Sequence, residues 1–154
     1  MLPDDVLLAA FDFYMRDPTN EPGSKKKEEE WQTLVHVCRR WRTVVFGSLR
    51  RLNLQLFCTP KTPARDLLGV WPALPLTIWG HDDYPMEGVD NITAVLEHSD
   101  RVCLIKLVGV SSSHLESITA AMQVPFPELT VLVLDLNDET VPVLPDSFLG
   151  GSAL

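Results

Sequence analysis

The first third of the chain carries hydrophobic side chains at the spacing of amphipathic helices. A first apolar stripe follows Pro3 and consists of Val6, Leu7, Ala10, Phe11 and Tyr14. Pro3 suits the first position of a helix, and Asp4 and Asp5 suit the positive end of the helix dipole. The pattern therefore predicts a helix that opens at Pro3.

A second apolar stripe follows after a polar stretch. Its members share one helical face and are Trp31, Leu34, Val35, Cys38, Trp41 and Val45. Val37 adds apolar surface outside this stripe, and residues 42–46 form a third short helix. The polar stretch over 16–30 has no side chain for a core, so it is expected to be a solvated loop. Three short helices cannot bury this much apolar and aromatic surface, so we expect another polypeptide to cover part of it.

The remaining two-thirds of the chain repeats the pattern Leu-x-x-Leu-x-Leu at intervals of about 24–29 residues. The trios are Leu49, Leu52 and Leu54; Ala73, Leu76 and Ile78; Val102, Ile105 and Leu107; and Leu129, Leu132 and Leu134. Each trio alternates as a strand does. Helical patterns lie between them, with starts expected at a Thr62 cap before Pro63, at Asp90 and at Ser113. A strand and a helix in each interval predict the βα unit of a curved, parallel repeat array.

Some features of this region depart from a regular array. Pro75 falls inside the second candidate strand, which is therefore expected to be short, bulged or at an edge. Asn137 stands at the turn position that marks regular leucine-rich repeats, and most other units lack it. Leu154 falls where a fifth unit would begin, without a polar capping unit, so we expect a fragment of a longer product. The alternative for the whole region is a plain α/β layer.

Composition and charge narrow the function classes. The chain has 154 residues, 45% hydrophobic content and a formal net charge of −8. Basic residues concentrate over 31–66, where arginines interleave with an apolar helical face, while 67–154 is strongly acidic; nucleic-acid binding is therefore not expected. There is no secretory signal and no apolar run of ~20 residues, so no membrane association is expected either. The three cysteines are widely spaced and predict no disulfide framework or zinc site, which favours a cytoplasmic or nuclear protein.

The search for catalytic chemistry finds little. The sequence has no nucleophile elbow, no glycine-rich phosphate loop and no zinc-protease motif. Its four histidines are scattered, and His81, Asp82 and Asp83 form one loop cluster without a second ligand group. We therefore expect no enzyme activity, no catalytic residue, no cofactor and no metal site.

The order of the N-terminal motifs resembles a known family. Leu-Pro-Asp-Asp-Val-Leu, then Phe11, then Leu-Val-His-Val-Cys-Arg-Arg-Trp over 34–41 resembles an F-box of the fungal type. The resemblance covers Leu2 to about Leu52. The chain departs from the usual pattern in the length of 16–30, and in Ala9 and Ala10, where an acidic residue and a large aliphatic residue are more typical.

The resemblance implies an F-box-like helical module over 1–48, with an insert loop at 16–30, followed by an irregular leucine-rich-repeat-like βα region over 49–154. It also implies a substrate-receptor subunit of a cullin-based ubiquitin ligase. Such a subunit binds a Skp-type adaptor, joins the cullin assembly through it, and holds a protein target of unknown identity with its repeats. The matching adaptor-binding positions are Leu2, Pro3, Val6, Leu7, Phe11, Leu34, Val37, Cys38 and Trp41. The alternative is a repeat-based interaction scaffold with no ligase role.

Overall fold

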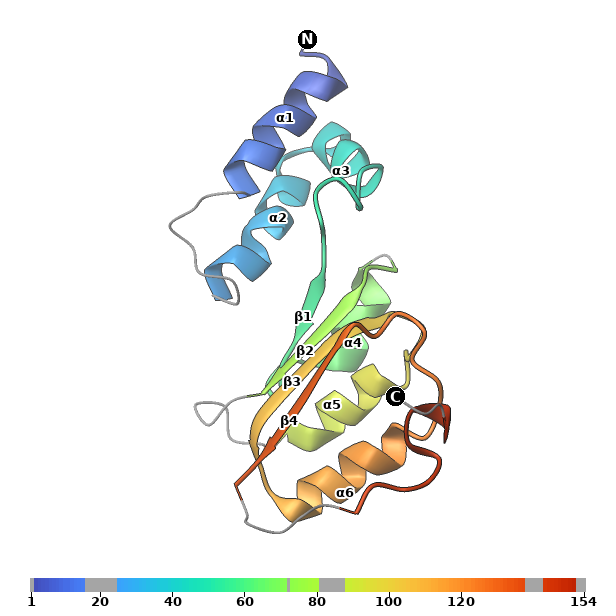
Figure 1. The fold of residues 1–154 in the computed structure, drawn as a ribbon. Coiled ribbons are helices and arrows are strands. Elements are labelled where there is room, and N and C mark those ends of the chain that lie inside the picture. The colour runs from blue at the N-terminus through green and yellow to red at the C-terminus, as the bar shows by residue number, and fades with distance from the viewer. Residues whose placement is uncertain (1, 16–24, 72, 81–87, 138–142, 152–154) are drawn as a thin grey trace. The chain divides into compact units, whose positions relative to one another are not determined.

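The computed structural model describes residues 2–15, 25–71, 73–80, 88–137 and 143–151, and only the backbone over 25–30. The chain divides into two compact units, Met1–Gln55 and Leu56–Leu154. The first is helical, and the second alternates strands with helices (Figure 1). The expected boundary at 48/49 falls within the turns that precede Gln55. The structure confirms a mixed α/β chain in which N-terminal helices precede four parallel strands that alternate with helices.

The first unit contains three helices, α1 (Asp4–Met15), α2 (Lys25–Val37) and α3 (Arg39–Phe46). The second apolar stripe was predicted to lie on one continuous helical face, and this is wrong. Cys38 is extended, with φ −160° and ψ 167°, so the helix breaks there and α3 starts in a new direction. As a result Cys38 is exposed, although its neighbours on the predicted stripe, Val35 and Val45, are fully buried.

Helix α2 begins earlier than the pattern predicted. The stretch over 16–30 was expected to be a solvated loop throughout, but residues 25–30 are helical. Lys and Glu are good helix formers even without an apolar face, and the α2 core residues that follow anchor the helix. The rest of the expected loop, over 16–24, lies outside the described residues.

The second unit is a four-stranded parallel sheet with helices between its strands. The strands are β1 (Leu56–Cys58), β2 (Leu76–Gly80), β3 (Val102–Val110) and β4 (Val131–Leu136). The helices are α4 (Ala64–Val70), α5 (Val89–Leu96) and α6 (Ser112–Ala121), and a short 3-10 turn, η2, spans Phe148–Gly151.

The order of the strands in the sheet is the order of the chain, β1-β2-β3-β4. Parallel crossovers are right-handed, so a sheet that grows in one direction receives all its helices on one face. Figure 1 shows α4, α5 and α6 on the same side of the sheet. The core lies between the sheet and these helices. There Cys58, Ile78 and Ile105 form a fully buried row in register across three strands.

The positions of the strands correct the predicted pattern in part. Leu52 and Leu54 were expected in the first strand, but both lie in the turns before Leu56, where β1 begins. They are nevertheless buried, at 4% and 2% exposure. Apolar alternation therefore predicted burial here but not ladder pairing. Pro75 directly precedes β2, which is an interior strand with a register irregularity at Leu76.

The starts of α4, α5 and α6 were predicted to within about two residues, a normal margin for helix ends. The expected cap at Thr62 is wrong, since Pro63 occupies that position and the Thr62 hydroxyl accepts a hydrogen bond from the Thr59 N–H at 2.9 Å. Ser113 lies inside α6, whose cap is Ser111. Near the end of the described chain, the Leu149 N–H donates to the Met122 carbonyl at 2.7 Å. Leu154, the expected start of a fifth unit, lies outside the described residues.

Candidate functional site

The core of the first unit uses one side of each helix. The buried apolar side chains of these helices are Leu7, Leu8, Phe11, Trp31, Leu34, Val35, Val44 and Val45. Two aromatic contacts join the helices: Phe11 lies 4.7 Å from Trp41, and Trp31 packs edge-on against Phe46 at 6.3 Å between ring centroids. The Trp31 indole N–H also donates to the Gln55 carbonyl at 3.2 Å. These contacts define which face of α1 points inward.

Helix α1 has a second apolar face that points away from this core. Val6, Ala9, Ala10 and Phe13 lie within an arc of roughly 100° on the helix, and all are exposed. Val6 is 48% exposed and Phe13 is 85% exposed. The predicted single stripe is therefore wrong in one respect: it combined residues of two faces. Leu7 and Phe11 point into the bundle, whereas Val6, Ala10 and Tyr14 lie on the surface.

The segment before α1 is tied to α3 by one arginine. The Arg40 guanidinium donates to the Leu2 carbonyl and forms an ion pair with Asp4, with 2.6 Å between Nη2 and Oδ1. These contacts hold the backbone of Leu2 in place while its side chain stays 59% exposed. Asp4, predicted as a helix-dipole residue, thus also anchors α1 to α3.

The nine predicted adaptor-binding residues divide between surface and core. Leu2, Pro3, Val6, Val37 and Cys38 are exposed, and Val37 reaches 57%. Leu7, Phe11 and Leu34 are buried at 6%, 2% and 6% exposure, so their side chains serve the bundle core in this unit. Trp41 is partly buried and contacts Phe11.

Phe13 is the residue of this surface that sequence reasoning missed. It occupies position i+7 from Val6, which is a helical repeat distance, but it fell outside the stripe that ran from Val6 to Tyr14. We define the docking surface as Leu2, Pro3, Val6, Phe13, Val37 and Cys38. Leu2, Val6, Phe13 and Val37 are large apolar side chains that remain exposed on this small unit, at 59%, 48%, 85% and 57%. Exposed apolar side chains that the fold does not need are candidates for an interaction site.

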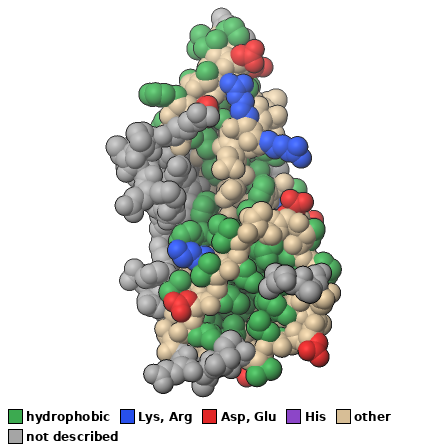
Figure 2. Space-filling view, in the orientation of Figure 1, with side chains coloured by type: hydrophobic (Ala, Val, Ile, Leu, Met, Phe, Trp, Pro, Cys, Tyr) green, Lys and Arg blue, Asp and Glu red, His purple; other side chains and the backbone are tan. Residues whose placement is uncertain are grey.

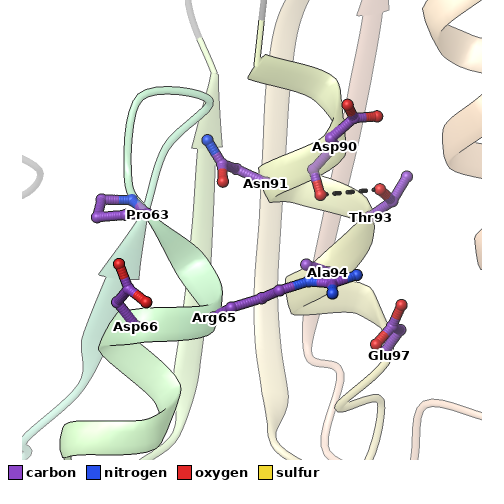
Figure 3. A pocket seen from close by; sticks show the side chains of 8 residues that line it. All are labelled: Pro63, Arg65, Asp66, Asp90, Asn91, Thr93, Ala94 and Glu97. Carbon is purple, nitrogen blue, oxygen red and sulfur yellow. Dashed lines mark hydrogen bonds between the residues drawn. The ribbon is translucent and has the colours of Figure 1, made fainter.

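The second unit has a charged hollow between α4 and α5, with a volume of about 490 Å³. Figure 3 shows Arg65 extending from α4 towards Ala94 and Glu97 of α5. The Asn91 amide donates to the Pro60 carbonyl at 2.7 Å, and the Thr93 hydroxyl donates to the Asp90 carbonyl at 3.0 Å. These polar groups are thus occupied in holding the helices and loops. The hollow brings no nucleophile next to a base.

The cysteines and acidic groups offer little reactive chemistry in the described part of the chain. Burial raises the pKa of the Cys58 thiol from 9.0 to about 12, although Arg101 opposes the shift. A thiol with such a pKa is not a nucleophile at neutral pH. No group of three or more His, Cys, Asp or Glu side chains that could hold a metal ion occurs among the described residues. The loop cluster of His81, Asp82 and Asp83 lies outside them.

The sheet also lacks a feature that nucleotide-binding α/β folds use. Open α/β sheets bind their ligands where the strand order reverses, and the order of the four described strands never reverses.

Among the described helices, none combines the length and the apolar character that a membrane span requires. No family model, curated protein or solved structure matches the chain.

Proposed function

We propose that this protein is a substrate-receptor subunit of a cullin-based ubiquitin ligase. In this proposal the first unit is an F-box-like module that binds a Skp-type adaptor. The second unit is an irregular leucine-rich-repeat-like array that holds a protein target. The ligase reaction itself is carried out by other subunits, because the contribution of this chain is effective concentration: it links two binding sites. Such a role belongs to the cytoplasm or the nucleus.

The observation that carries the proposal is the second apolar face of α1. One face of this helix, with Leu7 and Phe11, already supplies the bundle core. Val6 and Phe13 on the other face have no need to be apolar for the fold of this unit. Fully burying a side chain of this kind is worth roughly 1.5–3 kcal/mol, which a partner helix or groove would recover on binding.

The chemistry of this surface suits a protein partner. It combines an aromatic anchor, Phe13, with smaller apolar side chains and the exposed junction between α2 and α3 at Val37 and Cys38. Arg40 fixes the backbone of Leu2 in advance, so less conformational entropy is lost when a partner binds there. Aromatic anchors of this type commonly cost about 2 kcal/mol or more in binding when truncated.

Two features of the second unit support the repeat assignment. Each of β1, β2 and β3 is followed by a helix on the same face of the sheet, and neighbouring units pair in strict chain order. In addition, the Asn137 side-chain amide donates to the Gly109 carbonyl at 2.9 Å, from the end of β4 to the bulged part of β3. An amide that satisfies a carbonyl of the preceding unit is the role that an asparagine at this turn position would have in an array of stacked repeats.

Co-expression with a Skp-type adaptor tests the proposal. The wild-type chain is expected to co-elute with the adaptor as a 1:1 complex in size-exclusion chromatography. Val6→Asp places a charge on the docking surface and should abolish co-elution. The helix should tolerate the change, because position 6 lies near the start of α1, where an acidic residue is favoured. Val70→Asp is the matched control, because Val70 is an exposed valine, at 74%, in the second unit. It should co-elute like the wild type.

Two outcomes would contradict the proposal: a well-folded wild-type chain that elutes without the adaptor, or equal co-elution of the Val6→Asp and Val70→Asp variants. Circular dichroism of both variants must match the wild type before their elution is compared. Leu7→Asp is unsuitable for this test, because Leu7 is 6% exposed and a buried charge would unfold the bundle. If the adaptor is not bound, the chain is better described as an interaction scaffold without a ligase role.

A further inference from the structure

The face of the sheet opposite α4, α5 and α6 is not covered by any described helix of the second unit. Its side chains lie in register across the strands, because paired residues of a parallel sheet point to the same face. One row runs from Phe57 through Thr77 and Leu104 to Val131, and the next runs from Trp79 through Lys106 to Val133. We call these seven residues the open sheet face.

The open sheet face becomes more exposed towards β4. Thr77 near its centre is 1% exposed, whereas Val131 and Val133 are 42% and 39% exposed. Figure 2 shows hydrophobic side chains gathered on the surface in the region where Figure 1 draws β4. Most of this face is thus apolar and partly accessible, which suits an extended segment of another polypeptide.

One cation stands in the middle of this face. The Lys106 ammonium lies 4.8 Å from the centroid of the Trp79 ring, and this cation–π contact holds the ammonium over β2. No ion pair of Lys106 with another described residue is present. An anion that approaches the open sheet face therefore finds a positive charge already positioned.

Trp79 adds a second unused group at the same place. Its indole N–H is buried and has no hydrogen-bond acceptor among the residues that the structure describes. A buried donor without an acceptor is unfavourable, so an incoming carboxylate or carbonyl that reaches it after a small side-chain shift gains a hydrogen bond. The Lys106 ammonium, which lies over the Trp79 ring, and the indole N–H of that ring are thus two donors at one place in the sheet.

The surrounding charge limits how acidic the occupant can be. Asp135 is exposed on β4, two residues beyond Val133 and on the same face, and the chain over 67–154 is strongly acidic. A run of acidic residues would be repelled, whereas a single carboxylate placed at Lys106 gains a short contact that salt screens only weakly. Apolar neighbours of that carboxylate would cover Leu104, Val131 and Val133.

We propose that the open sheet face binds an extended, mainly apolar peptide segment of the target that carries one carboxylate, held by Lys106 and Trp79. This deepens the proposed function, on which it rests for the idea that the second unit holds a protein target. Specificity comes from the carboxylate, and most of the contact area comes from the apolar rows on either side.

The test uses the full chain and a fluorescein-labelled peptide, Gly-Ser-Val-Leu-Glu-Leu-Val-Ser-Gly, with blocked ends. Two further peptides replace the central Glu by Gln or Lys. In fluorescence polarisation the Glu peptide should bind at least tenfold more tightly than the Gln peptide, and the Lys peptide should bind most weakly. Lys106→Met keeps the aliphatic stem and should reduce the affinity for the Glu peptide to that for the Gln peptide. Lys106→Arg should retain the preference.

Lys61→Met is the matched control, because Lys61 is exposed in the turn before α4. It should leave all three affinities unchanged. Trp79→Phe keeps a ring but removes the N–H, and should weaken the Glu peptide more than the Gln peptide, because a hydrogen bond to a charged acceptor is the stronger one. The inference is overturned if no peptide binds, if the Glu and Gln peptides bind equally, if the Lys peptide is preferred, or if Lys106→Met and Lys61→Met behave alike.

Failure of this inference can be told apart from failure of the proposed function. Lys106→Met leaves the docking surface of the first unit intact, so it should still co-elute with the adaptor. A chain that binds the adaptor but not the Glu peptide refutes only the inference about the sheet face. A chain that binds the Glu peptide but not the adaptor keeps that peptide site and loses the ligase role.

Discussion

Two valines on helix α2 separate the contribution of the core from that of the docking surface. Val35 is 0% exposed and Val37 is 57% exposed, although they are only two positions apart on the same helix. Replacement by alanine removes the same two methyl groups at each site. Any difference between the variants in stability or in binding therefore reflects position rather than chemistry.

The expected magnitudes follow from burial. At about 0.8 kcal/mol for each buried methylene-sized group, Val35→Ala loses ~1.6 kcal/mol of transfer free energy. The cavity left behind raises the total to roughly 2–3 kcal/mol, because a well-packed core relaxes only in part. Val37→Ala removes groups that are already largely in water and should change the free energy of unfolding by less than about 0.5 kcal/mol.

Urea unfolding, followed by far-UV circular dichroism and by tryptophan fluorescence, measures the difference. Because the chain forms two compact units, the transition that reports on Trp31 and Trp41 should move to lower urea in Val35→Ala, and the transition of the second unit should not move. Adaptor binding should show the opposite ranking, with Val37→Ala weakened and folded Val35→Ala unchanged. Equal losses of stability in the two variants would refute the assignment of inward and outward faces on α2.

Four further outcomes are expected. Gly88→Ala should destabilise the second unit by roughly 1–3 kcal/mol in thermal unfolding, because a Cβ there would lie 1.8 Å from the Pro60 carbonyl oxygen. Gly69→Ala in α4 meets no atom within 4 Å and should instead stabilise it by about 0.5–1 kcal/mol; the same sign for both variants would contradict this. The pKa of Cys58 rises from 9.0 to about 12 on folding, so the unfolded thiol ionises first and stability should fall as pH rises from 9.0 to about 12, a loss that Cys58→Ala should not show in pH-dependent urea titrations. Under native conditions a thiol reagent should label exposed Cys38 long before buried Cys58, and simultaneous labelling would show that the sheet core opens readily.

Helix existence was predictable because the 3.6-residue period is a local signal. The break at Cys38 was not, since its extended backbone lets α3 turn back onto α1, where Arg40 reaches Asp4. The ion pair between Arg40 and Asp4 is a contact between residues that are distant in sequence. Propensity and periodicity carry no information about it.

The candidate site was predictable only in outline for the same reason. Val6 and Leu7 differ by 100° on a helix, so the pattern showed that both are apolar but not which of them faces inward. That direction is set by where Trp41 and Phe11 meet, at 4.7 Å between ring centroids. Phe13 was missed because it lies on the face of α1 that the bundle core does not use, and the sequence pattern does not show which face that is.

The strands show a third limit on what can be predicted from the sequence. Leu52 and Leu54 have the alternation of a strand and the burial of core residues, yet the ladder begins at Leu56. Pairing depends on the backbone at the start of β2, where the carbonyl of the preceding Pro75 accepts a hydrogen bond from the Leu56 N–H at 2.9 Å. The equivalence of Ile105 with Leu132, by contrast, was predicted correctly and appears directly in the register of β3 with β4.

The agreement between chain order and strand order has a consequence for how such a unit changes over evolutionary time. Each βα segment borders only its immediate predecessor and successor, so duplication of one segment by recombination lengthens the sheet without forcing any existing hydrogen-bonded pair apart. Loss of a segment likewise lets its two neighbours close on one another. Variation in the number of segments is therefore an easier route to new binding specificity for this architecture than rearrangement of its topology.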